Sequence, residues 1–297
     1  MDSGAEDLFM KILVTGATGH FGRKVVRTLL ASIPAENLAV SVRDTAKASE
    51  LKALGVDVRH GDFDYPATLD TAFQGVDRLL IVSTQGDNDT RIKQHLAAVD
   101  AAMRAGVGFI AYTSLANADK STLSLAKVHQ ETEKAIRETR IPFSFLRNNW
   151  YIENETGSFQ GVLKGAPLTI SAGDGKVGFA ARNDYAEAAA KVITSDNHEN
   201  TVYELSGKPI TYEGLALVLS KAISRDVPVQ NVDDCTYADI MASAGVPKEI
   251  IPFLVDIQSS IRRGALAYES NDLEKLLGRP LTPLSDVVRD IIDGLKA

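Results

Sequence analysis

Short apolar runs alternate along the first half of the chain with longer segments in which apolar residues recur every three or four positions. The runs are typical of buried strands in a parallel sheet, and the longer segments of amphipathic helices. Strands are predicted at Met10–Thr15, Leu38–Val42, Val56–Arg59, Arg78–Val82, Val107–Thr113 and Phe143–Arg147. Helices are predicted at Phe21–Ser32, at Ile92–Ala105 with Gly106 as its C-cap, and at Leu123–Glu138, with another after Asp44. The alternation predicts an α/β fold of Rossmann type, with a doubly wound parallel sheet covered on both faces.

The pattern changes after Trp150, where glycines and the AGDGK turn at 172–176 indicate a loop-rich region. A helix at Asp184–Thr194 and a strand at Val202–Leu205 are expected to return to the sheet, and helices dominate from Tyr212 onward.

This change predicts two parts of unequal size. An α/β domain is expected at residues 10–155, with return segments near 178–206, and a smaller, mainly helical lobe at 156–297. Residues 1–9 are acidic and lack a long apolar stretch, so they are expected to be a flexible N-terminal extension and not a signal peptide.

Composition and charge exclude several classes of function. The net charge is −7, and Lys and Arg form no cluster that could neutralise a nucleic-acid backbone. No apolar run is long enough to span a membrane. The histidines and Cys235 lack the spacing of metal ligands, so no metal is expected. A single cysteine cannot form an internal disulfide, which favours a reducing, cytoplasmic location.

Residues 16–22 read GATGHFG and lie between the first predicted strand and the first predicted helix. Glycines at such a turn let a pyrophosphate approach the helix N-terminus, where free N–H groups and the helix dipole favour an anion. The loop is therefore a candidate dinucleotide site, with a tight turn that binds no ligand as the alternative. The expected contacts come from Gly16, Thr18, Gly19, His20, Phe21 and Gly22. No second loop of this kind follows, so a nicotinamide coenzyme is expected without a flavin.

The end of the second predicted strand distinguishes NADPH from NADH. A carboxylate there would bind an unphosphorylated ribose, whereas an arginine accommodates the 2′-phosphate. The stretch SVRD places Arg43 at this point, with Lys47 one helical turn later. Asp44 is interpreted as a helix cap directed away from the phosphate, because a carboxylate would repel it. The sequence favours NADPH, and a solvated surface cation is the alternative for Arg43.

Polar residues also follow other predicted strands, at the carboxyl ends where open α/β sheets bind ligands. Asp62 could accept a hydrogen bond from an adenine amino group and Phe63 could cover the base, although a turn aspartate and a core phenylalanine are equally consistent. Further candidate ligand contacts, or loop caps, are Ser83, Thr84, Gln85, Thr113 and Ser114.

His129 lies on the last helix predicted before Trp150 and shares a face with Leu125 and Glu133, since residues four apart align. Glu133 could orient the imidazole ring or merely pair with it at the surface. A lone helical histidine is more often structural than catalytic, so both roles stay open.

Together these stretches resemble the NmrA-like atypical short-chain dehydrogenase/reductases, most closely the type 2 NADPH:quinone oxidoreductases. The resemblance runs from Met10 to the last helix. Several short blocks in one order carry it: GATGHFG (16–22), VRDTAK (42–47), FIAYTSL (109–115), HQETEK (129–134), LRNNWYIEN (146–154), AGDGK (172–176), RNDYA (182–186) and VYELSG (202–207).

The resemblance implies that the α/β domain binds NADPH through the glycine loop and Arg43, and that a quinone occupies a cleft formed with the C-terminal lobe. It implies that Leu125 stands at the position of the tyrosine that ordinary short-chain enzymes use as proton donor, and His129 at that of their lysine. Asn148 and Asn149 would face the nicotinamide and the substrate, with a helix cap as the alternative for Asn149.

The missing tyrosine restricts the chemistry. Reduction of a ketone produces an alkoxide, whose conjugate acid has a pKa close to that of water, about 15.7, and this step needs a proton donor. Reduction of a quinone produces an anion comparable to a tyrosine phenolate, with a pKa of about 10, which water or His129 can protonate afterwards. The sequence therefore predicts an NAD(P)H:quinone oxidoreductase that transfers a hydride directly, without a catalytic tyrosine.

Two other functions are left open by the sequence. A non-catalytic NADP(H)-binding sensor that regulates a protein partner is the main alternative. Reduction of aromatic ethers or lactones is less favoured, because related enzymes of that kind need a lysine near position 129. A small-molecule quinone is the expected partner, and a homodimer is left open.

Overall fold

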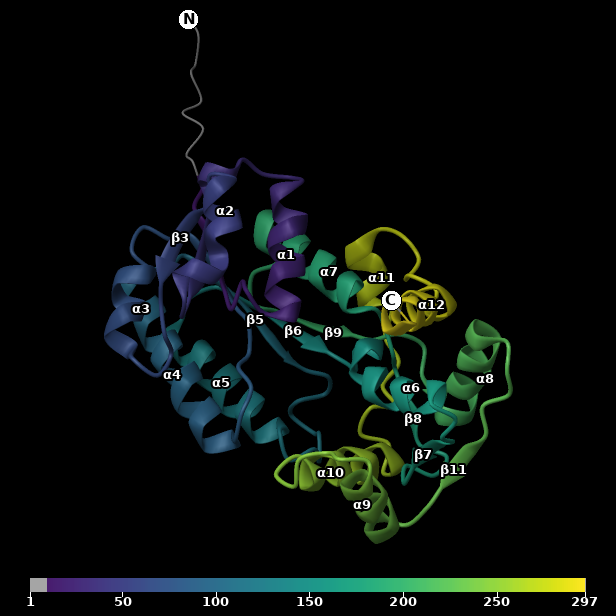
Figure 1. Ribbon diagram of the computed structural model, residues 1–297. Coiled ribbons are helices and arrows are strands. Elements are labelled where there is room, and N and C mark those ends of the chain that lie inside the picture. Colours follow the sequence, from purple (N-terminus) through teal and green to yellow (C-terminus); the bar gives the residue numbers. More distant parts are fainter. Residues whose placement is uncertain (1–9, 297) are drawn as a thin grey trace, which may run out of the picture. The chain divides into compact units, whose positions relative to one another are not determined.

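The computed structural model describes residues 10–296, so the predicted extension at residues 1–9 lies outside the described chain. The chain forms two compact units that interleave along the sequence (Figure 1). The first unit contains the residues up to Ser114, Val128–Leu146 and Ala186–Val202, and the second contains Leu115–Lys127, Arg147–Tyr185 and the chain from Tyr203 onward.

A seven-stranded sheet has the strand order β3-β2-β1-β4-β5-β6-β9. Its strands are β1 (Ile12–Thr15), β2 (Leu38–Val42), β3 (Asp57–His60), β4 (Arg78–Ile81), β5 (Phe109–Leu115), β6 (Phe143–Asn148) and β9 (Thr201–Leu205). The pairs β1–β2, β2–β3, β1–β4 and β4–β5 are parallel, and Ile12 lies opposite both Leu38 and Arg78. The central strands β1 and β2 are buried along their whole length, as their continuous apolar runs require. The predicted Rossmann-type α/β fold is confirmed.

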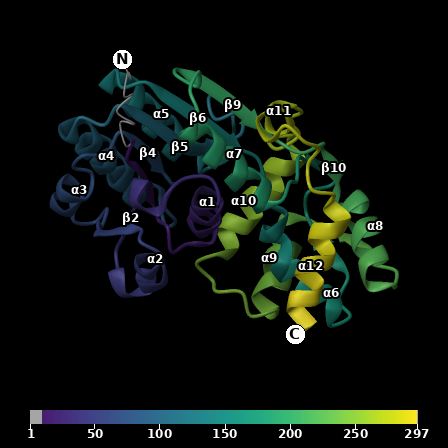
Figure 2. The same cartoon turned by 90° about the horizontal axis from the view of Figure 1, so that it is seen from above.

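Helices cover both faces of this sheet. Figures 1 and 2 show α3, α4 and α5 on one face and α1 on the other. The helices that follow the strands are α1 (His20–Leu30), α2 (Ser49–Ala53), α3 (Pro66–Ala72), α4 (Asn88–Ala105), α5 (Ala126–Thr139) and α7 (Arg182–Thr194). Phe73, Val99 and Ile136 bury their side chains in one apolar cluster with the sheet. Gly106 ends α4 with a φ of 72°, the left-handed cap that the sequence predicts.

The strand order reverses between β1 and β4, because the chain first runs outward to β2 and β3 and then crosses to β4. Open α/β sheets bind ligands at the carboxyl ends of strands beside such a reversal. A Cβ atom added to Gly16 would lie 3.7 Å from Cβ of Val82. The start of the glycine loop therefore adjoins the end of β4 at this reversal point.

The second unit is mainly helical. Its helices are α6 (Thr156–Leu163), α8 (Tyr212–Ile223), α9 (Asp234–Ser243), α10 (Ile251–Arg262), α11 (Asp272–Leu277) and α12 (Leu284–Lys296). Two small sheets add β7 (Leu168–Ile170) parallel to β11 (Val229–Asn231), and β8 (Lys176–Val177) antiparallel to β10 (Ile210–Thr211). Phe159, Phe179 and Leu219 belong to its apolar core. None of the helices between residues 10 and 296 is long and apolar enough to cross a membrane.

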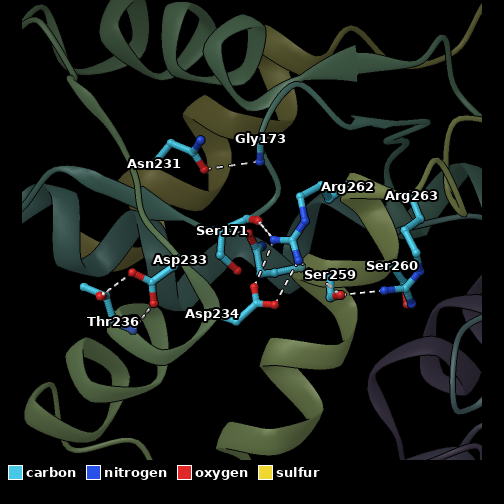
Figure 3. Close-up of polar contacts among 11 residues, drawn as sticks. Ser171, Gly173, Asn231, Asp233, Asp234, Thr236, Ser259, Ser260, Arg262 and Arg263 are labelled. Carbon is cyan, nitrogen blue, oxygen red and sulfur yellow. Dashed lines mark hydrogen bonds and ion pairs between the residues drawn. The ribbon is translucent and has the colours of Figure 1, made fainter.

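An ion pair ties α9 to α10 in this unit (Figure 3). Arg262 donates to both carboxylate oxygens of Asp234, at 2.9 and 2.8 Å, and also to the carbonyl of Ser171. The hydrogen bonds from Arg262 lower the pKa of Asp234 to about 2. The AGDGK turn packs directly on α10, because a Cβ atom at Gly175 would lie 2.4 Å from the carbonyl oxygen of Ile261.

Candidate active site

The glycine loop joins β1 to α1. Gly16 has a φ of +61°, a left-handed conformation that glycine adopts without strain. Gly22 permits close packing, because a Cβ atom there would lie 2.3 Å from the carbonyl oxygen of Gly16. Gly19 caps α1 without a side chain, and the first turn of α1 contains no acidic residue. The positive end of the α1 dipole can therefore receive an anion, which fits a dinucleotide pyrophosphate. Among the other predicted contacts, the structure leaves His20 exposed and Thr18 half-buried and buries Phe21.

The end of β2 has the arrangement that the sequence predicts for Asp44. Its carboxylate accepts a hydrogen bond from the N–H of Ala46 at 3.0 Å and caps the short 3-10 helix Thr45–Ala48. Arg43 is exposed and makes no hydrogen bond or ion pair with residues 10–296. Its guanidinium is therefore available to a 2′-phosphate, and its role in coenzyme binding stays a prediction.

The segment after β3 has the local contacts of a turn. Asp62 accepts a hydrogen bond from the N–H of Asp64 at 3.0 Å, and its own N–H donates to Oγ1 of Thr68. Phe63 is half-buried and packs against the apolar cluster of the first unit. These contacts favour the turn and core roles, and the proposed contacts to adenine stay predictions.

Hydroxyl groups hold the carboxyl ends of β4 and β5 together. The N–H of Ser83 donates to Oγ1 of Thr113 at 2.8 Å, and this hydroxyl donates to Oγ of Ser83 at 3.3 Å. Ser114 donates to a carboxylate oxygen of Glu133 on α5 at 2.6 Å. Gln85 is exposed. The structure thus assigns internal contacts to these hydroxyls, and direct contacts to a coenzyme stay predictions.

His95, on α4, fixes the turn that follows β4. Its Nε2 accepts the backbone N–H of Thr84 at 2.9 Å, and because an N–H can only donate, the ring proton must reside on Nδ1. Nδ1 lies 2.9 Å from Oγ1 of Thr132, whose hydroxyl donates to the carbonyl of Val128. Burial, with a smaller effect from the positive charge of Arg91, lowers the pKa of His95 to about 3. His95 is therefore a neutral link between β4 and α5.

His129 is hydrogen-bonded to a buried tyrosine. The Tyr112 hydroxyl lies 2.8 Å from Nδ1 of His129 and 3.3 Å from Nδ1 of His95. Because Nδ1 of His95 carries a proton, the hydroxyl can accept from His95 and donate to His129, which leaves the His129 proton on Nε2. Burial and the charge of Arg91 lower the pKa of His129 well below its ordinary value. His129 is therefore a neutral imidazole at physiological pH.

Sequence reasoning overlooked this buried network. Tyr112 lies within the predicted strand Val107–Thr113, His95 is one of the histidines without metal-ligand spacing, and Arg91 is not among the candidate residues. The available signal was the spacing of Arg91 and His95, which lie four residues apart and therefore share one face of α4 directly after a candidate ligand-binding turn.

Asn149 belongs to the second unit and has satisfied hydrogen bonds at both ends of its amide. Its Nδ2 donates to Oγ of Ser206 at 3.0 Å and to the carbonyl of Leu266 at 3.1 Å. Its Oδ1 accepts the N–H of Trp150 at 2.8 Å. These contacts give Asn149 a role in joining β6 to the segments after β9 and α10.

Asn148, in the same unit, keeps a polar atom without a partner. Its Nδ2 donates to the Tyr151 hydroxyl at 3.0 Å, but its buried Oδ1 has no hydrogen-bond partner among residues 10–296. Burial raises the pKa of Tyr151 to about 12, and its ring packs edge-on against Tyr185 at 5.1 Å between centroids. A buried acceptor without a partner costs about 1–3 kcal/mol, so a ligand that donates to Oδ1 would be favoured. Sequence reasoning quoted Tyr151 within LRNNWYIEN but gave it no role.

Each unit thus gathers part of the predicted site. The first unit holds the glycine loop, the ends of β1 and β4, and His129 with its buried partners. The second holds Asn148 and Asn149.

The model of the NmrA-like family matches residues 10–275. The chain belongs to the NmrA-like family. The family resemblance carried by the short sequence blocks is therefore confirmed. Quinone oxidoreductase 2 of Escherichia coli (strain K12) is 40% identical over 95% of this chain and 99% of its own length.

Two solved structures are similar along nearly the whole chain. Triphenylmethane reductase of Citrobacter sp., complexed with NADP(H), matches with a TM-score of 0.92 and 40% identity over 95% of this chain and 100% of that one. NADPH-dependent quinone oxidoreductase QOR2 of Escherichia coli, complexed with NADPH, matches with a TM-score of 0.91 and 40% identity over 94% of this chain and 99% of that one.

Proposed function

We propose that the protein reduces quinones with NADPH by direct hydride transfer and without a catalytic tyrosine. The observation that carries the proposal is the glycine loop, which lies at the point where the strand order of the sheet reverses. The whole chain matches the NADPH complex of the E. coli quinone oxidoreductase with a TM-score of 0.91. Such a loop is suited to a dinucleotide.

Different residues bind the two negatively charged parts of the coenzyme, the pyrophosphate and the 2′-phosphate. NADPH supplies the hydride when bound. The glycine loop and the N-terminus of α1 hold the pyrophosphate, because the loop has no side chain at Gly19 and no acidic residue in the first turn. Arg43 would pair with the 2′-phosphate. The neighbouring carboxylate of Asp44 does not compete for Arg43, because it already accepts the hydrogen bond that caps the helix Thr45–Ala48.

The protonation states of the site suit an acceptor that needs no strong acid. His129 is neutral, and the position of the usual tyrosine is occupied by Leu125, which packs against an apolar core. A hydroquinone anion is a weak enough base to leave without a proton in the hydride step, unlike an alkoxide. Water can protonate it afterwards. Neutral His129 can only donate a hydrogen bond to it through Nε2–H, because loss of that proton would leave an imidazolate.

Asn148 is the amide that can serve the reacting end of the site. Its Nδ2 group has two protons and donates one of them in a hydrogen bond to the Tyr151 hydroxyl. Its Oδ1 has no hydrogen-bond partner among residues 10–296. The amide can therefore bind the nicotinamide carboxamide or donate to a quinone oxygen that gains negative charge.

Optical measurement of NADPH oxidation with a panel of benzoquinones and naphthoquinones, plus one triphenylmethane dye, tests the proposal. Wild-type protein should oxidise NADPH with several of the quinones, and Leu125→Tyr should not raise the rate. A wild type that binds NADPH but turns over none of the panel would overturn the proposal and favour the NADP(H)-binding regulator. A large gain from Leu125→Tyr would mean that a proton donor limits the reaction.

A further inference from the structure

Arg91, at the N-terminal end of α4, is a buried cation without a counter-ion in the described chain. The residue is 9% exposed, and its Nε is buried without a hydrogen-bond partner. Its guanidinium forms no hydrogen bond or ion pair with residues 10–296. Burial lowers the pKa of Arg91, but a guanidinium remains protonated in proteins. Buried charges are normally paired, so a negative group from outside the described chain would stabilise Arg91.

The side chains around Arg91 do not neutralise it. Its charge lowers the pKa of both His95 and His129, which are neutral, and Tyr112 is a neutral phenol whose pKa burial raises. The carboxylate of Glu133 acts on Tyr112 and accepts a hydrogen bond from Ser114, but it is not paired with Arg91. Arg91 and its three ring neighbours thus carry a net positive charge.

Arg91 lies near the carboxyl ends of the strands, where open α/β sheets bind ligands. α4 begins directly after the turn at the carboxyl end of β4, and His95, one helical turn beyond Arg91, binds the N–H of Thr84 in that turn. The positive end of the α4 dipole is offset by the Asp87 cap and by Asp89 in the first turn, so the guanidinium of Arg91 is the positive group that remains. His129, whose Nε2–H can donate a hydrogen bond to the product, belongs to the same buried network.

We propose that Arg91 is a subsite for a negatively charged oxygen of the substrate, and that the protein prefers quinones whose ring carries an ionised hydroxyl group. The inference rests on the proposed function and specifies its substrate class. A phosphate of the coenzyme is a less suitable counter-ion, because the glycine loop and Arg43 already provide its anion contacts. The same guanidinium would bind the hydroquinone anion that hydride transfer produces.

Equilibrium binding of two matched naphthoquinones in the presence of NADP⁺ tests the inference without turnover. The probes are 2-hydroxy-1,4-naphthoquinone, which is ionised at neutral pH, and its neutral 2-methoxy analogue. Wild-type protein should bind the anion about ten- to a hundredfold more tightly, as expected for a charge-assisted hydrogen bond. Arg91→Gln should abolish this preference, and Arg91→Lys should keep part of it.

The matched control is Arg104→Gln, which removes the same charge from the same helix. Arg104 is half exposed and already paired with Asp70 at 2.6 Å, so this variant should keep the full preference for the anion. A folded Arg91→Gln variant that still prefers the anion overturns the inference. So does a variant whose NADP⁺ affinity falls instead, because Arg91 would then serve the coenzyme.

Two further outcomes keep the test decisive. If Arg91→Gln does not fold, the wild type still decides, because equal affinity for the two probes overturns the inference. The failure of the proposed function is separate, since it appears as absence of NADPH oxidation with neutral benzoquinones in the wild type.

Discussion

The hydroxyl of Tyr112 lies 2.8 Å from Nδ1 of His129, and both residues are buried. Tyr112 comes from the middle of β5 and His129 from the first turn of α5, so the bond joins the sheet to the helix beside it. In this environment His129 is held neutral, because burial and the charge of Arg91 both oppose its protonation.

We therefore expect the pH profile of quinone reduction to show no transition from His129 near neutrality. His129→Ala should lower kcat by no more than about tenfold. The effect is small because the phenolate-like product needs no obligatory acid in the hydride step. Steady-state rates of both proteins across the pH range check this. A transition near the ordinary histidine pKa that disappears in His129→Ala would contradict it.

The lowered pKa of His95 predicts a loss of stability in acid. The unfolded chain binds a proton at an ordinary histidine pKa of 6.5, whereas folded His95 does so only at about 3. The free energy of unfolding should therefore fall as pH drops from 6.5 toward 3, by up to about 1.4 kcal/mol per pH unit for this group. Urea unfolding of wild type and His95→Gln across this range should give a shallower pH dependence in the variant. Parallel curves would refute the prediction.

Arg43 should determine the preference for NADPH over NADH. A charged hydrogen bond to the 2′-phosphate contributes about 1.5–3 kcal/mol, or about ten- to a hundredfold in affinity. Calorimetric titration of Arg43→Ala should show weaker binding of NADPH and little change for NADH. Lys47→Ala, one helical turn away, tests whether any nearby cation suffices. A full NADPH preference in Arg43→Ala would mean that this residue is only a surface cation.

Two glycines of the same loop should fail in different ways. A Cβ atom at Gly19 would lie 3.2 Å from the carbonyl oxygen of Gly16, a tight contact that small shifts relieve, whereas one at Gly22 would lie at 2.3 Å. Gly19→Val should therefore fold but lose NADPH binding, because its side chain occupies the place of the pyrophosphate. Gly22→Val should lower the melting temperature instead. Retained NADPH affinity in folded Gly19→Val would disprove the assignment.

Replacement of the two asparagines should affect different measurements, the catalytic rate for Asn148 and the stability for Asn149. Asn148→Ala should lower kcat by about a hundredfold or more if its amide donates to the developing charge, with little effect on stability. Asn149→Ala removes three hydrogen bonds of a buried side chain and should cost about 1–3 kcal/mol of unfolding free energy. Kinetics and thermal unfolding of both variants check the contrast. Equal loss of kcat at unchanged stability in both would contradict it.

The elements that depend on local pattern could be predicted. The alternation of apolar runs with helical periodicity predicted the strands of the sheet, and Asp44 and Gly106 were predicted as caps from residue type alone. Boundaries were less accurate. α4 begins at Asn88, ahead of the predicted Ile92, because Asp87 caps a first turn that contains no apolar residue. α5 begins at Ala126, after the predicted Leu123.

The glycine loop could be predicted from residue type and spacing alone, because the steric restrictions that require glycine there act over a few consecutive residues. They also determined the absence of a tyrosine at position 125. Only the tertiary structure decided that His129 is neutral and bound to Tyr112, that Arg91 is buried without a counter-ion, and that Asn149 is satisfied while Asn148 is not. Those properties depend on burial and on partners far away in the chain, such as Leu266 for Asn149. The spacing of neighbouring residues can suggest a shared face, but it does not show whether a charge or an amide there is desolvated.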